Sequence, residues 1–146
     1  MKGDHLVETP RLGSILATLD ARCENRRYAR IPSFMRNHAN RIARSNQATP
    51  GVEGYVFDGV DGNQMAFWTC AEDAISVQHV HDFDEYMVVV HGCYTLLIDD
   101  KRIPLRSGDE YVIACGVAHG GEVAAGTRTI HAFGGHRADR VQDVMS

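Results

Sequence analysis

The 146-residue chain is long enough to bury one hydrophobic core, and its 44% hydrophobic and 23% charged residues are typical of a globular domain. No apolar run approaches the roughly 20 residues of a membrane helix, and the first residues lack the apolar stretch of a secretory signal. The four cysteines contain no Cys-x-x-Cys pair, which argues against a zinc ribbon or a dithiol redox motif. We therefore expect a cytoplasmic protein with no membrane partner.

The formal net charge of -4 is unevenly distributed along the chain. Residues 1–45 carry 9 Lys and Arg against 4 Asp and Glu, whereas residues 46–146 carry 6 against 15. The basic segment has neither interleaved aromatic side chains nor a helix-turn-helix pattern, so it does not favour a nucleic-acid partner. Charge complementarity favours an arm that lies on the acidic part of its own chain or of a partner chain.

The first 50 residues are predicted to form this basic arm, with short helices. Apolar residues recur at helical spacing within residues 11–28, namely Leu12, Ile15, Leu16 and Leu19. A second short helix is predicted over residues 34–43, after Pro32. The polar segment SNQATPG at residues 45–51 then interrupts the helical pattern. We place the domain boundary there, with an arm at residues 1–50 and a β domain at residues 51–146.

From Val52 onward, short apolar segments alternate with turn signals. Eight or nine short strands are predicted, with segments in chain order over residues 54–57, 64–70, 74–81, 85–91, 93–98, 102–105, 110–114 and 127–133. Many short strands in a segment with few helical signals are typical of an antiparallel sandwich or barrel. The fold class is therefore predicted to be all-β.

Three histidines and a glutamate have a spacing that suits a metal site. His79 and His81 are two residues apart on a predicted strand, so both side chains leave the same face. Glu85 begins the next strand, where we expect strand pairing to place it beside the histidine pair. His119 follows on a glycine-rich loop. Three imidazoles and a carboxylate suit one divalent ion, either Fe, Mn, Ni, Co or Zn, without selecting among them.

In these residues the sequence resembles the cupin superfamily. His79, His81, Glu85 and Gly92 match its first motif, and Gly108, Gly116 and His119 match its second. Three positions depart from the motifs, namely Asp73 in place of glycine, Ala114 in place of proline and Val123 in place of asparagine. The resemblance covers about residues 65–133. It implies a double-stranded β-helix, or jelly-roll barrel, with His79, His81, Glu85 and His119 as the metal ligands.

The resemblance implies a metal-dependent function but not one reaction. One hypothesis is an enzyme that acts on a small oxygenated or carboxylate-bearing molecule, as a dioxygenase, isomerase, decarboxylase or lyase. The alternative is a metal-containing module that binds or senses a small molecule without turnover. Cupin barrels often pair through their sheets, so we expect a homodimer.

His131 is the candidate catalytic residue outside the ligand set. It shares a strand face with Thr129 and Phe133, so it points either into the barrel, as a substrate contact or general base, or into solvent. Six apolar side chains are candidates for either pocket or core, namely Tyr55, Phe57, Phe67, Trp68, Met87 and Val89.

Overall fold

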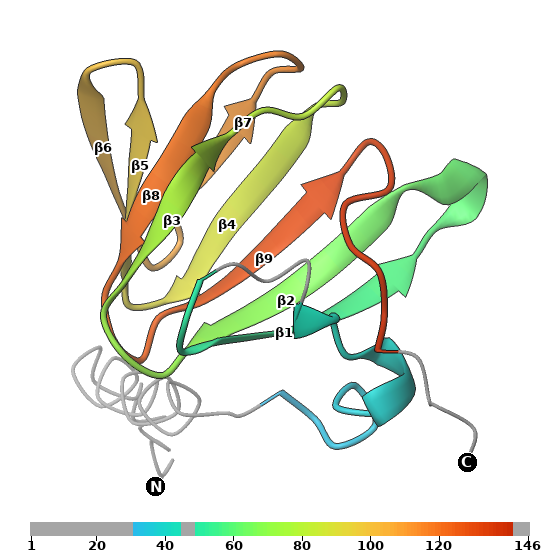
Figure 1. The fold of residues 1–146 in the computed structure, drawn as a ribbon. Coiled ribbons are helices and arrows are strands. Elements are labelled where there is room, and N and C mark those ends of the chain that lie inside the picture. The colour runs from blue at the N-terminus through green and yellow to red at the C-terminus, as the bar shows by residue number, and fades with distance from the viewer. Residues whose placement is uncertain (1–30, 45–48, 142–146) are drawn as a thin grey trace, which may run out of the picture. The chain divides into compact units, whose positions relative to one another are not determined.

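Two antiparallel β-sheets lie face to face in the computed structural model, which describes residues 31–44 and 49–141 (Figure 1). The five-stranded sheet has the order β1 (Val52–Asp58), β2 (Gln64–Cys70), β9 (Arg128–Phe133), β4 (Glu85–His91) and β7 (Glu110–Ile113). The four-stranded sheet has the order β3 (Ala74–His79), β8 (His119–Val123), β5 (Cys93–Ile98) and β6 (Lys101–Arg106). Two 3-10 turns accompany them, η1 (His38–Asn40) and η3 (Val60–Gly62). The predicted all-β jelly-roll fold is confirmed.

The hydrophobic core fills the space between the sheets. One buried cluster joins Met87 and Val89 of β4 to Leu96 of β5 and Leu105 of β6, so it connects both sheets. A second cluster lies under β1 and β2 and includes Ile42, which precedes the first strand. Alternation along β4 places Glu85, Met87 and Val89 on the interior face. The metal-site glutamate therefore lies on the same face as the core.

Gly92 allows the chain to pass from β4 in one sheet to β5 in the other. Its φ of +86° lies in the region that favours glycine. A Cβ atom at this position would lie 2.4 Å from Thr127 Oγ1 and 2.8 Å from Thr127 Cα. The Thr127 hydroxyl also bonds the backbone of Cys93 at 3.1 Å. Gly92 is thus required both by backbone conformation and by close packing.

One strand, β8, is not among the predicted strands. Its sequence, HGGEV, contains two glycines, which have low strand propensity, and residues 116–121 were expected to form a loop. Packing explains the glycines, because a Cβ atom on Gly121 would lie 2.2 Å from the Tyr94 hydroxyl oxygen. A Cβ atom on Gly120 would lie 3.0 Å from the carbonyl oxygen of Ser76. The glycines therefore mark a close approach in the sheet.

The segment that precedes β1 is less helical than predicted. Residues 34–43 form turns and the three-residue helix η1, which the side chain of Asn37 caps, in place of the predicted helix. Backbone bridges join Arg41 to Tyr55 and Ile42 to Arg140. This pairing holds the segment extended, and strand-like bridges replace helical hydrogen bonds. The helix predicted over residues 11–28 lies outside the described residues, and the domain boundary at residue 50 stays a prediction.

Candidate metal centre

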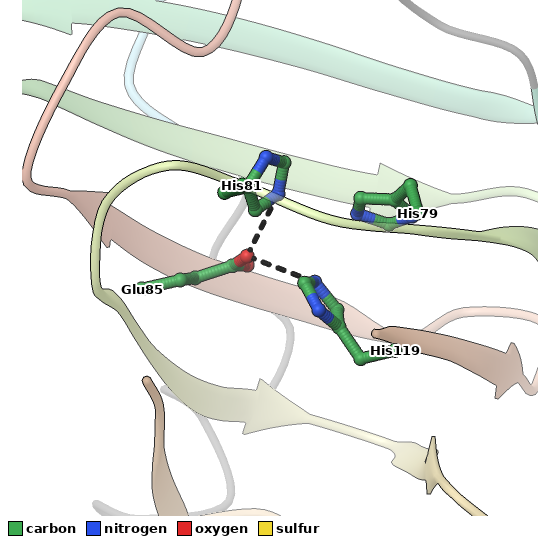
Figure 2. Close-up of side chains that lie close together, drawn as sticks. All are labelled: His79, His81, Glu85 and His119. Atoms are coloured by element: carbon green, nitrogen blue, oxygen red, sulfur yellow. Dashed lines mark ion pairs between the residues drawn. The ribbon is translucent and has the colours of Figure 1, made fainter. Parts of the chain in front are cut away.

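The four predicted metal ligands converge between the two sheets. His79 ends β3 and His119 begins β8, and these two residues are direct partners across the strand pair. His81 lies in the loop after β3, and Glu85 begins β4. The pairing of β3 with β8 is irregular between Ser76 and His79, which turns the end of β3 toward the site. Figure 2 shows the four side chains directed toward one another.

Glu85 reaches the histidines by a different route from the one predicted. Strand pairing was expected to place it beside them, but β4 pairs with β7 and β9, whereas β3 belongs to the other sheet. That expectation is wrong, because the loop over residues 80–84 carries the chain between sheets. Glu85 consequently approaches the histidines across the interior.

The ligand atoms are spaced as a single cation requires. One nitrogen or oxygen atom from each side chain lies within 4.8 Å of the others. Glu85 Oε2 is 3.2 Å from His81 Nε2 and 3.2 Å from His119 Nε2 (Figure 2). Adjacent ligands about 2.1 Å from an octahedral ion lie about 3.0 Å apart. The two 3.2 Å separations from Glu85 Oε2 therefore fit adjacent corners of a metal coordination shell.

Three of these atoms are buried without a hydrogen-bond partner. They are His81 Nε2, Glu85 Oε2 and His119 Nε2. Leaving one buried polar atom unsatisfied costs about 1–3 kcal/mol, so three that face one another need a common partner. A divalent cation satisfies all three at once, which a single hydrogen-bond donor cannot do.

Backbone hydrogen bonds prepare two of the imidazoles for metal binding. His79 Nδ1 lies 2.8 Å from the carbonyl oxygen of Val77, and His119 Nδ1 lies 2.9 Å from that of Val117. A carbonyl accepts only, so each Nδ1 carries the proton and each Nε2 keeps its lone pair. The lone pairs are therefore available to an ion, and the ring orientations are fixed.

The electrostatics of the site favour a negative charge on Glu85 and a neutral His79, and they favour a proton on His119. Burial alone would raise the pKa of Glu85, but the neighbouring His119, His131 and His81 side chains hold that pKa below its usual value. Burial lowers the pKa of His79. Burial acts in the same direction on His119, yet the interaction with Glu85 raises its pKa above the usual value. Protons and metal ions therefore compete for Nε2 of His119.

His131 lies beside Glu85 in the interior and not in solvent. It is 8% exposed, and its Nδ1 lies 2.5 Å from Glu85 Oε1. Its Nε2 lies 2.9 Å from the hydroxyl oxygen of Thr129. Of the two orientations left open by the sequence, the structure has the inward one. The role of general base stays a prediction.

A small cavity adjoins the ligands. Its volume is about 100 Å³, and its walls include Trp68, Met87, Tyr94, Ile113 and Phe133. A cavity needs only about 10–15 Å³ of such volume to hold one water, so this space admits more than one water or a small molecule beside the metal site.

Arg137 supplies the positive charge of this cavity, and sequence reasoning missed it. Its side chain is partly buried and lines the cavity, and its guanidinium carbon lies 6.0 Å from the centroid of the Phe133 ring. Within the described part of the chain, no carboxylate lies within ion-pair distance of it. Burial lowers the pKa of Arg137 without removing its charge. No periodicity signals this residue, because it follows β9 in an irregular segment.

The apolar candidate residues divide among the cavity, the core, which includes Val89, and the outer face of the five-stranded sheet. Trp68 and Met87 line the cavity, whereas Phe57 and Phe67 pack edge to face with ring centroids 5.7 Å apart. Phe67 pairs with Tyr55 across β1 and β2, so these aromatic residues share a sheet face that alternates with that of Trp68.

Solved structures with the same fold support the cupin resemblance. KdgF from Halomonas sp. is 19% identical, with a TM-score of 0.54 over 66% of this chain and 86% of that one. An RmlC-like cupin from Shewanella frigidimarina is 19% identical, with a TM-score of 0.53 over 65% of this chain and 82% of that one. Salicylate 1,2-dioxygenase from Pseudoaminobacter salicylatoxidans is 12% identical, with a TM-score of 0.54 over 57% of this chain. This chain matches 26% of the dioxygenase.

These similarities establish the fold, which is the cupin fold. The sequence matches no protein-family model, and no curated protein sequence matches it. Among the described residues, no helix has the length and apolarity needed to cross a membrane.

Proposed function

We propose that this cupin-fold chain is a metal-dependent enzyme that acts on a small carboxylate-bearing molecule. The proposal rests on one cavity that is lined by Glu85 and His119, which bear two of the three unsatisfied ligand atoms, and by Arg137, which has no ion-pair partner among the described residues. His79, His81, Glu85 and His119 would hold one divalent ion of Fe, Mn, Ni, Co or Zn. The bound ion would supply a Lewis acid beside the cavity.

Arg137 indicates the chemical class of the substrate, which is a carboxylate. A guanidinium presents paired N–H groups that match the two oxygens of a carboxylate, and partial burial strengthens such a contact. The nearest charge of opposite sign in the site is Glu85, which the histidines and His131 already engage. An anionic group of the substrate therefore complements the free guanidinium and orients the rest of the molecule toward the metal ligands.

The remaining cavity wall positions the rest of the substrate. Trp68, Met87, Ile113 and Phe133 exclude water from its apolar part. Burial raises the pKa of the Tyr94 phenol, so this side chain remains protonated at neutral pH and can donate a hydrogen bond. The cavity therefore combines an anion contact, an apolar wall and a neutral proton donor.

A panel of small carboxylic acids tests the proposal. Protein loaded with Fe(II), Mn(II) or Zn(II) is incubated with each acid, and oxygen uptake, CO2 release and product mass are measured. Metal-dependent turnover that Arg137→Met reduces at unchanged metal content supports the enzyme. Acids that raise the melting temperature without any turnover would support the alternative, a binding or sensing module.

We also propose that the chain forms a homodimer through the outer face of the five-stranded sheet. Met65, Ala132, Tyr86 and Val112 form one row across four paired strands. Met65 is 43% exposed, Tyr86 36% and Val112 64%, so the row presents a continuous apolar surface. Val112→Lys should shift the protein to the monomer mass in sedimentation, whereas Val60→Lys, an exposed position in η3, should not. A monomeric parent protein would contradict the proposal.

A further inference from the structure

We propose that His131 is a positioning residue that fixes which oxygen of Glu85 faces the metal. The inference rests on the metal site proposed above and assigns His131 a different role from the general base expected from the sequence. It starts from the strand register. Glu85 pairs directly with Phe133 of β9, and His131 lies two residues before Phe133. A diagonal neighbour on the same interior face is within reach of a long side chain.

The two carboxylate oxygens of Glu85 have separate partners. Oε1 lies 2.5 Å from His131 Nδ1, whereas Oε2 lies 3.2 Å from both His81 Nε2 and His119 Nε2. Only Oε2 lacks a hydrogen bond. The division leaves one oxygen for an ion and occupies the other, so Glu85 would bind through a single oxygen.

The Glu85 carboxylate, which can only accept, requires a proton on His131 Nδ1, and the hydroxyl of Thr129 suits this ring form because it can donate to Nε2. Thr129 Oγ1 lies 2.9 Å from His131 Nε2, and Thr129 is itself 5% exposed. When the hydroxyl donates to Nε2, the ring proton resides on Nδ1 and is donated to Glu85. Both ring nitrogens are then engaged, and neither keeps a lone pair for a substrate proton. Hydrogen bonding therefore favours positioning over base catalysis.

Packing keeps the ring in place. The His131 ring stacks on Phe133 with centroids 5.9 Å apart, and the Tyr94 ring meets it edge-on at 6.4 Å. These contacts limit ring rotation, so the hydrogen bond to Glu85 has a fixed direction. An ion that binds Oε2 alone retains more open positions for substrate than one chelated by both oxygens.

The test compares two substitutions at His131. His131→Leu keeps bulk but removes the donor, and His131→Asn restores an N–H close to the position of Nδ1. Mn(II) affinity is measured by competition with a chelator, and the visible absorption of the Co(II) protein reports the ligand geometry. We expect a loss of about 10–100-fold in affinity and an altered spectrum for His131→Leu. His131→Asn should recover much of both, and His38→Ala, an exposed histidine away from the site, should change neither.

The outcomes separate this inference from the metal site itself. If the parent protein binds neither ion, the proposed metal site fails. If the parent protein binds but His131→Leu matches it in affinity and spectrum, the positioning role is overturned. If His131→Leu does not fold, Thr129→Val is measured in its place. Valine keeps the shape of threonine, and loss of the hydroxyl frees His131 Nε2. A lower Mn(II) affinity of Thr129→Val supports the inference, and an unchanged affinity with an unchanged Co(II) spectrum contradicts it.

Discussion

Replacement of His119 by alanine should remove most of the stabilisation that a bound metal gives. His119 is 3% exposed, and its Nε2 is one of the three unsatisfied ligand atoms. Free metal at about 100 times Kd stabilises a folded protein by about 2.7 kcal/mol. At about 4 °C per kcal/mol, the melting temperature of the parent protein should rise by about 11 °C. Changes outside the ligand shell cost about 10–100-fold in affinity, so loss of a ligand should cost at least about 100-fold.

At the same free metal concentration, the variant would be stabilised by at most about 0.4 kcal/mol, or about 2 °C. Each protein is melted in calorimetry with metal and with chelator, and the two temperatures are subtracted. The subtraction cancels the cost of truncating a buried side chain, because that cost is present in both measurements. His38→Ala serves as the matched control and should keep the full rise. An undiminished rise in His119→Ala would refute the ligand assignment.

Three other predictions concern acidity, the cavity and a turn. Metal affinity should decrease as pH falls, because a proton on His119 competes with the metal ion, and the raised pKa of His119 should start the loss above about pH 6.5. A flat titration of affinity between about pH 5.5 and about pH 8 would contradict this. Arg137→Met should weaken carboxylate binding in calorimetric titration without changing metal content, and equal carboxylate affinity would remove the proposed contact. Gly92→Ala should cost about 1–3 kcal/mol more in urea unfolding than Gly108→Ala, since both have positive φ but only Gly92 has a close neighbour. Equal losses of unfolding free energy in the two variants would mean that Thr127 moves aside at no cost.

Strands could be predicted from the sequence where side chains alternate and turns are sharp. The predicted strands over residues 64–70, 85–91 and 93–98 have the observed bounds, and Gly92 and Asp99 directly follow the last two of them. The strand β8 escaped prediction because Gly120 and Gly121 are dictated by neighbours far away in sequence. Local strand propensity does not reflect such distant contacts.

The ligand set could be predicted, whereas the arrangement that assembles it could not. Spacing together with the resemblance to the cupin motifs grouped His79, His81, Glu85 and His119, and the structure brings all four together. The sheet assignment of β4 depends on how the chain crosses between layers, which the residues of the 80–84 loop do not specify. Arg137 was missed for the same reason, because its approach to the cavity depends on the fold of the segment after β9.

The most direct test of the metal centre is an anomalous diffraction map of crystals grown with Mn(II) or Zn(II). We predict one strong peak between the sheets, about 2.0–2.3 Å from the Nε2 atoms of His79, His81 and His119 and from Oε2 of Glu85. A map with no peak at this point, or with the ion bound only at exposed side chains, would contradict the central claim.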